Sequence, residues 1–378
     1  MRIEDDWLTD PATQAVFAML EGAGHRALAV GGCVRNALLG APVADIDIAT
    51  DARPEAVAEL ARAAGLKPVP TGIDHGTVTV VSAGKPHEVT TFRRDEETDG
   101  RRARVAFSDD VAEDAARRDF TMNALYADAT GAVVDPLGGL PDLRARHLRF
   151  IGDPVDRIHE DYLRILRFFR FTAWYGDPAL GLDAEGLAAC AAHQAGLDRL
   201  SAERVGHEMR RLLAAPDPAP AVAAMAQTGI LAHVLPGADA AVLAPAVHLG
   251  VDDWVARMAA LGGDASGLRL SKAETRELAA LSQGARDGMA PFALGDALGA
   301  RAGDALRIRA ALTGQPVDPA ALAGAAAGAA AAFPLTARDL MPDLSGPALG
   351  EALERARTAW RDSEGRLDRD ALAAIARG

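Results

Sequence analysis

Two aspartates, Asp45 and Asp47, stand with one residue between them in an otherwise apolar run. In a β-strand, residues i and i+2 project from the same face, so both carboxylates are predicted to point to one side while Ile46 and Ile48 point into the core. Adjacent carboxylates repel, and their burial is costly unless cations lie between them. Such hard oxygen ligands select Mg²⁺, and two Mg²⁺ ions can hold a nucleoside triphosphate for in-line displacement. The alternative is an edge strand whose exposed face is acidic.

A glycine pair lies about a dozen residues upstream of the aspartates. The apolar segment ALAV (27–30) runs into Gly31 and Gly32, and a segment of helical spacing follows. Backbone N–H groups at such a helix N-terminus attract phosphate, and glycine lets the ligand approach closely. Arg35, one turn further on, could close on the same phosphates. No G-K-[ST] follows, so this is not a Walker loop, and a plain Gly-Gly turn is the alternative.

Glu88 is a third candidate carboxylate, in the apolar segment HEVTTF (87–92). It could complete the metal cluster or help take the proton from an attacking hydroxyl. His87 beside it must point the other way if the segment is a strand. A solvent-facing strand glutamate is the alternative.

A second cluster, Arg117, Arg118 and Asp119, lies in the segment AARRDFTMNAL (115–125). Arginine can clamp a triphosphate bidentately, and a neighbouring carboxylate can accept from ribose hydroxyls, which would select ribonucleotides. A surface cluster of salt bridges, which contributes little to stability, is the alternative.

The segment EDYLRILRFFRF (160–171) combines an acceptor and a donor at helical spacing. Asp161 and Arg164 are three residues apart, so on a helix they are neighbours on one face. Arg167 and Arg170 continue the same spacing as an arginine stripe. An Asp–Arg pair complements cytosine and adenine, whereas uracil and guanine would leave buried groups unpaired at ~1–3 kcal/mol each. An ordinary amphipathic helix with ion pairs is the alternative.

The secondary structure predicted to position these residues differs between the two parts of the chain. The first 140 residues or so alternate β-branched runs with helical spacing, and almost every periodic segment from residue 157 onward is helical, including the alanine-rich 320–333. The sequence predicts strands at 27–30, 45–50, 76–82 and 87–92, a hairpin at 124–136, and helices at 34–40 and 53–65.

Composition excludes several classes of protein. The 378 residues are enough for two to four modules, and no window resembles a signal peptide or a membrane span. Cys33 and Cys190 alone cannot form a metal cluster or a disulfide framework, and they fit a reduced cytoplasm. The net charge of −13 argues against a protein that coats nucleic acid non-specifically.

Taken in order, these motifs resemble those of the class II tRNA nucleotidyltransferases, the CCA-adding enzymes, and their bacterial poly(A) polymerase relatives. GGCVRNALLG…DIDIAT is similar to that family's metal and phosphate motif, and RRDFTMNALY to its ribose motif. VVDPLGGLPDLRARHLRFIGDP (133–154) is similar to its hinge segment, EDYLRILRFFRF to its base-selecting motif, and AERVGHEM (202–209) to its neck-helix motif. The resemblance covers residues 25–210.

The resemblance implies a role for each matching residue. Asp45 and Asp47 would hold Mg²⁺, with Asp119 beside the ribose. Asp161 and Arg164 would read the base. The nucleotide and phosphate contacts would come from Gly31, Gly32, Arg35 and Arg118, and Arg167 and Arg170 would support the base readers.

The family's architecture implies an α+β fold. A nucleotidyltransferase head with a small mixed β-sheet and flanking helices (25–147) would follow a helical lead-in (1–24). An all-helical neck with the base-selecting motif (148–213) and a helical body and tail (214–378) that holds the tRNA acceptor arm would come next. The expected location is the cytoplasm, with no membrane and no obligatory protein partner.

The expected activity is template-independent addition of C, C and A to the 3′ end of tRNA from CTP and ATP, with release of pyrophosphate. The alternatives are a poly(A) polymerase, partial addition of CC or A alone, and a degenerate relative that binds RNA without catalysis. The pattern TGIDHGTVTVV (71–81) favours the CCA-adding group.

Two departures from the family's pattern affect the expectations. Asn36 stands where the family often has Asp, and no paired His-Asp motif of the phosphohydrolase kind is present, so no added phosphatase or phosphodiesterase activity is expected. The segment 93–110 has the composition of a mobile, solvated connection. The resemblance implies that this loop helps to switch from C to A addition, so shortening it should preserve CC addition and impair the final A.

Overall fold

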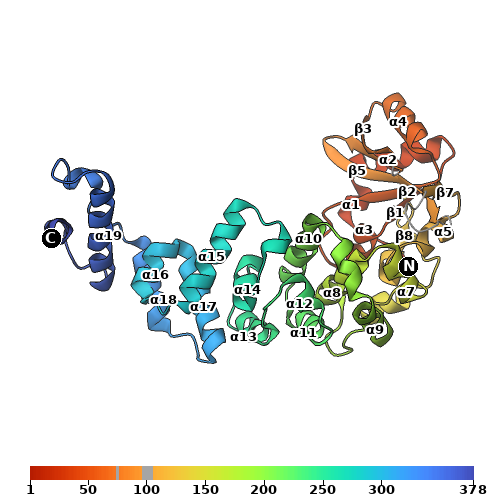
Figure 1. Cartoon of the computed structure of the whole chain (residues 1–378). Coiled ribbons are helices and arrows are strands. Elements are labelled where there is room, and N and C mark those ends of the chain that lie inside the picture. Colours follow the sequence, from red (N-terminus) through yellow and green to blue (C-terminus); the bar gives the residue numbers. More distant parts are fainter. Residues whose placement is uncertain (74–75, 96–104) are drawn as a thin grey trace. The chain divides into compact units, whose positions relative to one another are not determined.

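A computed structural model describes residues 1–73, 76–95 and 105–378 of the chain (Figure 1). It divides into two compact units, Met1–Gly196 and Leu197–Gly378. The division falls within the predicted neck (148–213). The first unit contains the β-sheet, and the second unit is helical throughout its described length.

The first unit is organised by a mixed seven-stranded sheet with the order β3-β4-β5-β2-β1-β8-β9. Strand β2 pairs antiparallel with β1 on one side and parallel with β5 on the other. The prediction of a small mixed sheet with flanking helices is therefore confirmed. The strands are β1 (Ala27–Val30), β2 (Asp47–Thr50), β3 (Lys67–Gly72), β4 (Thr77–Ser82), β5 (Lys85–Thr91), β8 (Tyr126–Ala127) and β9 (Val133–Val134).

The two faces of this sheet are covered by different helices. Helices α2 (Pro11–Gly22) and α4 (Pro54–Ala63) pack on the face that carries Ile48 and His87. His87 is buried there, and its Nε2 lies 3.1 Å from the Thr13 hydroxyl of α2, so it points away from Glu88 as predicted. Burial lowers the pKa of His87.

The opposite face carries Leu28, Val30 and Ala49, together with Tyr126 of β8, and it packs against α5 (Val111–Ala116). Because β2 alternates, Asp47 belongs to this face, together with Ala49. The pairing of Asp47 with Glu88 in parallel register places Glu88 on the same face. This face of the sheet therefore carries the candidate chemistry.

Three local predictions need correction. Strand β2 begins at Asp47, so Asp45 and Ile46 precede the strand and Ile46 is only partly buried. Strand β3 was not predicted because its two prolines argue against a strand, but β3 is the edge strand of the sheet, where proline is tolerated.

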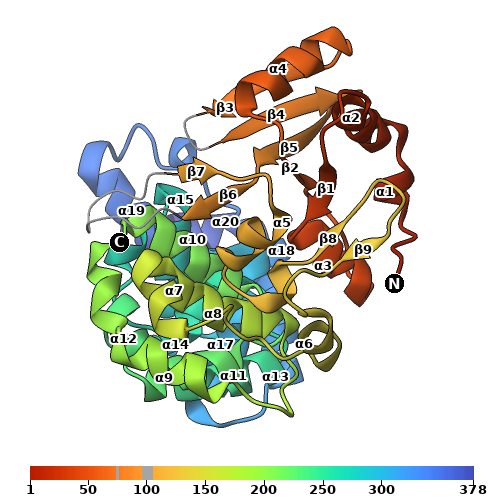
Figure 2. The same ribbon diagram turned by 90° about the vertical axis from the view of Figure 1, so that its right-hand side faces the viewer.

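The third correction concerns the segment predicted as a solvated connection. Its described ends form an antiparallel pair, β6 (Arg93–Asp95) and β7 (Val105–Phe107), and β6 contacts α5 (Figure 2). Residues 96–104 of the predicted switching loop lie outside the described residues, as do Asp74 and His75 of the TGIDHGTVTVV pattern.

The segment 157–176, predicted to be helical, belongs to two helices, α7 (Pro154–Glu160) and α8 (Leu163–Tyr175). Asp161 has an extended backbone with φ −155° and ψ 105°, which ends α7. Its Oδ1 accepts a hydrogen bond from the Leu163 N–H at 3.1 Å, so Asp161 satisfies a free donor at the start of α8. The helical spacing was right for α8, but Asp161 lies outside the helix.

The aromatic residues of α8 anchor that helix in the first unit. The ring of Phe168 lies 5.5 Å from that of Phe150, and the ring of Phe171 lies 5.4 Å from that of Phe120. The remaining helices of this unit are α1 (Asp6–Thr9), α3 (Gly32–Leu39), α6 (Leu140–Ala145) and α9 (Ala184–Ala192), with the 3₁₀ turns η2 (Thr121–Asn123) and η3 (Gln194–Arg199), the latter crossing into the second unit.

The second unit is built from helices, as predicted. They are α10 (Ala202–Leu213), α11 (Ala219–Gln227), α12 (Ile230–Val234), α13 (Leu243–His248), α14 (Trp254–Leu261), α15 (Lys272–Arg286), α16 (Pro291–Leu298), α17 (Ala302–Thr313), α18 (Pro319–Ala330), α19 (Gly346–Asp362) and α20 (Arg369–Arg377). Short 3₁₀ turns are η4 (Ala240–Val242), η5 (Ser266–Leu268), η6 (Gly299–Arg301) and η7 (Ala337–Asp339). No helix in the described part of the chain is both long enough and apolar enough to cross a bilayer.

The alanine-rich segment is a packed helix. A Cβ added at Gly328 of α18 would lie 2.0 Å from the Phe292 carbonyl oxygen of α16, and one at Gly295 of α16 would lie 2.0 Å from the Ala325 carbonyl oxygen. The two backbones therefore approach so closely that only glycine fits at these positions. This confirms the prediction that most of 320–333 is helical.

Candidate active site

The carboxylate pair lies at the N-terminal end of the central strand β2, beside the sheet face described above. Asp47 is partly buried at the start of β2, and Asp45 and Glu88 are exposed. Burial raises the pKa of Asp47 to about 6, the negative charges of Glu88 and Asp45 add to this shift, and the positive charge of Arg118 opposes it. The four side chains are therefore within electrostatic reach of one another, and Asp47 lies where a cation would be favourable.

The donor set of this region consists of carboxylates. In the described part of the chain, no three or more His, Cys, Asp or Glu side chains converge closely enough to hold a metal ion. Asp45 and Asp47 thus remain a two-residue set, and a third-ligand role for Glu88 is not supported. Two protein carboxylates are a common ligand set for Mg²⁺, which retains waters and substrate phosphates as its other ligands.

The glycine turn lies at the end of β1, next to this pair. Gly31 has φ 72° and ψ −118°, a conformation open to glycine alone, and α3 begins at Gly32. A Cβ on Gly31 would lie 3.6 Å from Arg118 Nη1 and 3.7 Å from the Asn123 carbonyl oxygen. The structure therefore brings Arg118 against the turn, as expected for two parts of one phosphate site.

Two residues that the sequence analysis did not select form hydrogen bonds with Arg118. Its Nε and Nη2 donate to Asp114 Oδ2 at 3.2 and 2.9 Å, and its Nε also donates to the Tyr126 hydroxyl at 3.1 Å. Burial alone would lower the pKa of Arg118, but Asp114 and Tyr126 outweigh it and raise the pKa. The spacing of Asp114 and Arg118, four residues apart, is the signal that could have found this pair.

Arg35 lies in a buried position rather than on the open side of the turn. It is 6% exposed, and its guanidinium donates to the Asn123 and Asn36 side-chain oxygens and to the Tyr175 hydroxyl. The guanidinium carbon also lies 3.9 Å from the centre of the Tyr175 ring. Asn36 therefore orients Arg35, and a phosphate contact by Arg35 stays a prediction.

Asp119 joins the ribose motif to α8. Its Oδ1 accepts from the Asn123 Nδ2 and from the Phe120 N–H, both at 2.9 Å, and its Oδ2 accepts from Arg167 Nε at 2.7 Å. Burial alone would raise the pKa of Asp119, but Arg167 and these hydrogen bonds outweigh it and lower the pKa. A hydrogen-bonded chain thus runs from Arg167 through Asp119 and Asn123 to Arg35.

The base-reading candidates are also tied to the ribose motif. Arg164 Nη2 donates to the Arg117 carbonyl at 2.8 Å, and Arg164 Nη1 donates to the Arg157 carbonyl at 2.9 Å and forms an ion pair with Glu160. Arg170 is buried, with its guanidinium carbon 4.2 Å from the centre of the Phe171 ring. The structure thus brings the start of α8 and residues 117–119 together, although the sequence alone predicted them as separate clusters.

Sequence reasoning missed four residues that position these groups. Asp114, Asn123, Tyr126 and Tyr175 each contact a predicted site residue. Asn123 and Tyr126 lie within the quoted RRDFTMNALY motif, whereas the contact of Tyr175 with Arg35 spans 140 residues of sequence and gives no local signal.

A carboxylate pair, a glycine turn and an arginine beside one face of a mixed sheet are the arrangement expected of a nucleotidyltransferase head. Comparison with known proteins agrees: residues 27–149 match the model of the poly A polymerase head domain, and residues 180–242 match a probable RNA and SrmB-binding site of polymerase A.

The relatives identify the family. The crystal structure of the Bacillus stearothermophilus CCA-adding enzyme with CTP superposes with a TM-score of 0.74 at 30% identity, covering 97% of this chain and 96% of that one. The chain belongs to the CCA-adding enzyme family of class II tRNA nucleotidyltransferases.

The matches to curated relatives cover a smaller share of each relative's length. The CCA-adding enzyme of Geobacillus stearothermophilus is 42% identical over 224 residues, and that of Anoxybacillus flavithermus is 39% identical over 222 residues. These matches cover 59% and 58% of this chain, and 54% of each relative. The chain thus spans about half the length of the curated relatives it matches.

Proposed function

We propose that this chain adds C, C and A to the 3′ end of tRNA without a template, using CTP and ATP. The observation that carries the proposal is the position of Asp47: it shares a sheet face with Glu88 and lies within electrostatic reach of Arg118, whose Nη1 faces the Gly31 turn. The relative with the bound CTP and a Thermotoga maritima CCA-adding enzyme in complex with tRNA support this choice of substrates.

In each addition, the RNA 3′ oxygen forms a bond to the α-phosphorus of the incoming nucleotide, and the bond from that phosphorus to the bridging oxygen of pyrophosphate breaks. The backbone N–H groups at Gly31 and Gly32 and the Arg118 guanidinium bind the phosphates. Glu88, exposed beside Asp47, accepts the proton of the attacking hydroxyl. Asp119 lies at the ribose.

Asp45 and Asp47 would hold Mg²⁺. The donor set fits, because both ligands are carboxylates, and because burial, with the added negative charges of Glu88 and Asp45, raises the pKa of Asp47, a cost that a divalent cation would offset. When bound, Mg²⁺ lowers the pKa of the RNA hydroxyl and neutralises charge on the triphosphate.

Base choice falls to the start of α8. Asp161 supplies the acceptor and Arg164 the forked donor that cytosine and adenine require, and the hydrogen bond from Arg164 to the Arg117 carbonyl links base reading to the ribose motif. Arg167 supports this region by fixing Asp119, and Arg170 by packing on Phe171.

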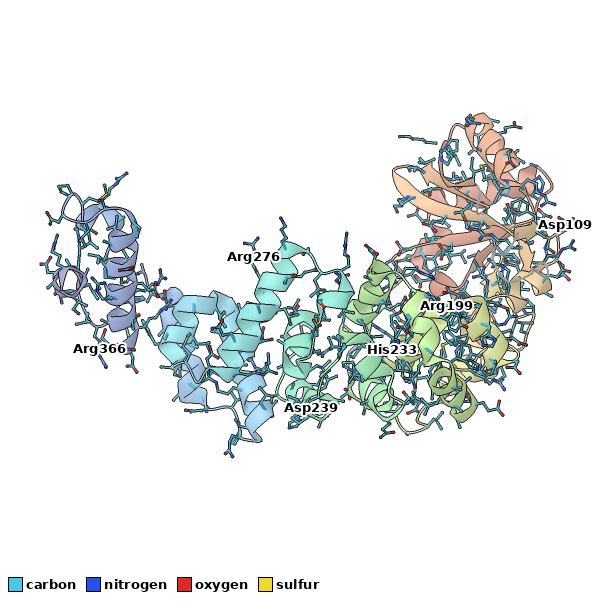
Figure 3. The ribbon with its side chains drawn as sticks, viewed as in Figure 1. Asp109, Arg199, His233, Asp239, Arg276 and Arg366 are labelled. Atoms are coloured by element: carbon cyan, nitrogen blue, oxygen red, sulfur yellow. The ribbon has the colours of Figure 1, made fainter. Side chains whose placement is uncertain are left out.

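The second unit would hold the tRNA. Its basic side chains are suited to phosphate contacts, and Figure 3 shows Arg276 projecting from α15. The exposed arginine and lysine residues from η3 to α15 are Arg199, Arg204, Arg211, Arg269, Lys272, Arg276 and Arg286.

A nucleotide-incorporation assay on tRNA that lacks its CCA end tests the proposal. CTP alone should add two residues, and CTP with ATP should add three. Long extension with ATP alone would indicate a poly(A) polymerase, a stop after CC would indicate partial activity, and no incorporation at all would support a binding protein.

A further inference from the structure

Asp114 is a buried carboxylate for which the proposed reaction has no direct use. It is 1% exposed and lies in α5, behind Arg118 as seen from the glycine turn. Its Oδ2 accepts from the Nε and Nη2 of Arg118 and, at 2.8 Å, from the Tyr126 hydroxyl. Its Oδ1 accepts from the Arg93 backbone N–H at 3.3 Å and from Arg117 Nε at 3.4 Å. One carboxylate thus satisfies donors from three segments of the chain.

The Tyr126 hydroxyl completes this arrangement. It donates to Asp114 and accepts from Arg118 Nε, so the three groups form a closed hydrogen-bonded triangle. Tyr126 lies on β8, directly opposite Val30 of β1, and Val30 is the residue that leads into Gly31. The strand that carries the glycine turn is therefore braced to the same carboxylate that holds Arg118.

We propose that Asp114 is a positioning residue for the nucleotide: it holds Arg118 against the glycine turn, where Nη1 faces Gly31. This inference rests on the proposed function, because it assigns Arg118 to the triphosphate. The inference predicts that substitution of Asp114 weakens the binding of CTP and of ATP to the same extent, since both nucleotides carry the same triphosphate.

The test is the variant Asp114→Asn, which keeps the shape of the side chain but removes its charge. The KM for CTP and for ATP should each rise on the order of tenfold, while kcat changes by less than about threefold. The matched control is Asp296→Asn in the second unit. Asp296 is also a carboxylate between two arginines, Arg357 and Arg361, and its loss should leave both KM values unchanged.

A double-mutant cycle separates positioning from general damage to the fold. If Asp114 acts through Arg118, the variant Asp114→Asn with Arg118→Lys should bind CTP no more weakly than Arg118→Lys alone. Fully additive losses would overturn the inference. If Asp114→Asn does not fold, Tyr126→Phe replaces it, with an expected KM increase of about threefold for both nucleotides, and an unchanged KM overturns the inference.

Equilibrium CTP binding to the wild-type chain distinguishes the two levels of failure. Wild-type protein that binds neither CTP nor ATP would overturn the proposed function and this inference with it. Wild-type protein that binds CTP, together with an Asp114→Asn variant that binds it equally well, would overturn this inference alone.

Discussion

Asp47 and Asp114 serve the same face of the head sheet but lie in opposite electrostatic surroundings. Burial acts on both to raise the pKa. At Asp114, Arg118, Tyr126 and Arg117 outweigh burial and hold the pKa below its usual range. At Asp47, Glu88 and Asp45 add to the effect of burial, and the pKa rises to about 6.

The difference separates a carboxylate that the fold satisfies from one that it leaves unsatisfied. Asp114 has all the donors it needs within the protein, so its charge is part of the structure. Asp47 carries a charge that the folded chain alone disfavours, which is typical of a side chain that meets an external cation or substrate. The predictions below test this contrast.

The largest effect is expected from removing the unsatisfied carboxylates. Asp45→Ala or Asp47→Ala should lower kcat for CMP incorporation by roughly 10³-fold or more, because each removes a predicted metal ligand. The control is Asp51→Ala, just beyond the other end of β2, where the side chain accepts from the Arg26 N–H and lies 3.0 Å from His25 Nδ1. Asp51→Ala should keep activity. Full activity in the Asp45→Ala and Asp47→Ala variants would contradict the assignment of these two residues as metal ligands.

The second-largest effect is expected on base selection. Asp161→Ala and Arg164→Ala should each lower the preference for CTP over UTP by about 10- to 100-fold, since each variant leaves one hydrogen-bonding group of cytosine unread. Competition between CTP and UTP on tRNA lacking its end measures this ratio. An unchanged ratio, with only a lower overall rate, would mean that these residues support the fold and do not read the base.

The smallest effect concerns stability. Because the pKa of Asp47 is about 6 in the folded chain and the ordinary pKa of an aspartate is 3.8, the folded chain binds more protons than the unfolded chain between about pH 4 and pH 6. The free energy of unfolding should therefore fall as pH rises through that window, by on the order of 1–2 kcal/mol for this group.

Denaturant unfolding of the wild type and of Asp47→Asn in EDTA checks this sign. The two should be about equally stable near pH 4, and Asp47→Asn should be the more stable near pH 7. A wild type that gains stability relative to the variant on raising the pH would contradict the assignment of Asp47 as unsatisfied.

Local patterns predicted the parts of the site that lie within single motifs. The strand β1, the turn at Gly31 and the opposite directions of His87 and Glu88 follow from short-range spacing and steric rules. Edge strand β3 was missed because its prolines are tolerated only when the sheet places that strand at the edge.

The rest depends on contacts that sequence spacing does not encode. At the break, the Asp161 side chain accepts from the Leu163 N–H, a local hydrogen bond that competes with continuing the helix. The buried position of Arg35 depends on Tyr175, far away in the chain, and the role of Asp114 depends on Tyr126 and the Arg93 backbone. Tertiary packing, not propensity, decides these cases.

Binding of Mn²⁺ followed by electron paramagnetic resonance, with CTP present, tests the central claim most directly, since Mn²⁺ accepts the same oxygen ligands as Mg²⁺. The account predicts that wild-type protein with CTP removes Mn²⁺ from solution beyond what CTP alone does, and that Asp45→Asn with Asp47→Asn abolishes this excess. Equal Mn²⁺ binding by the wild type and the double variant would contradict it.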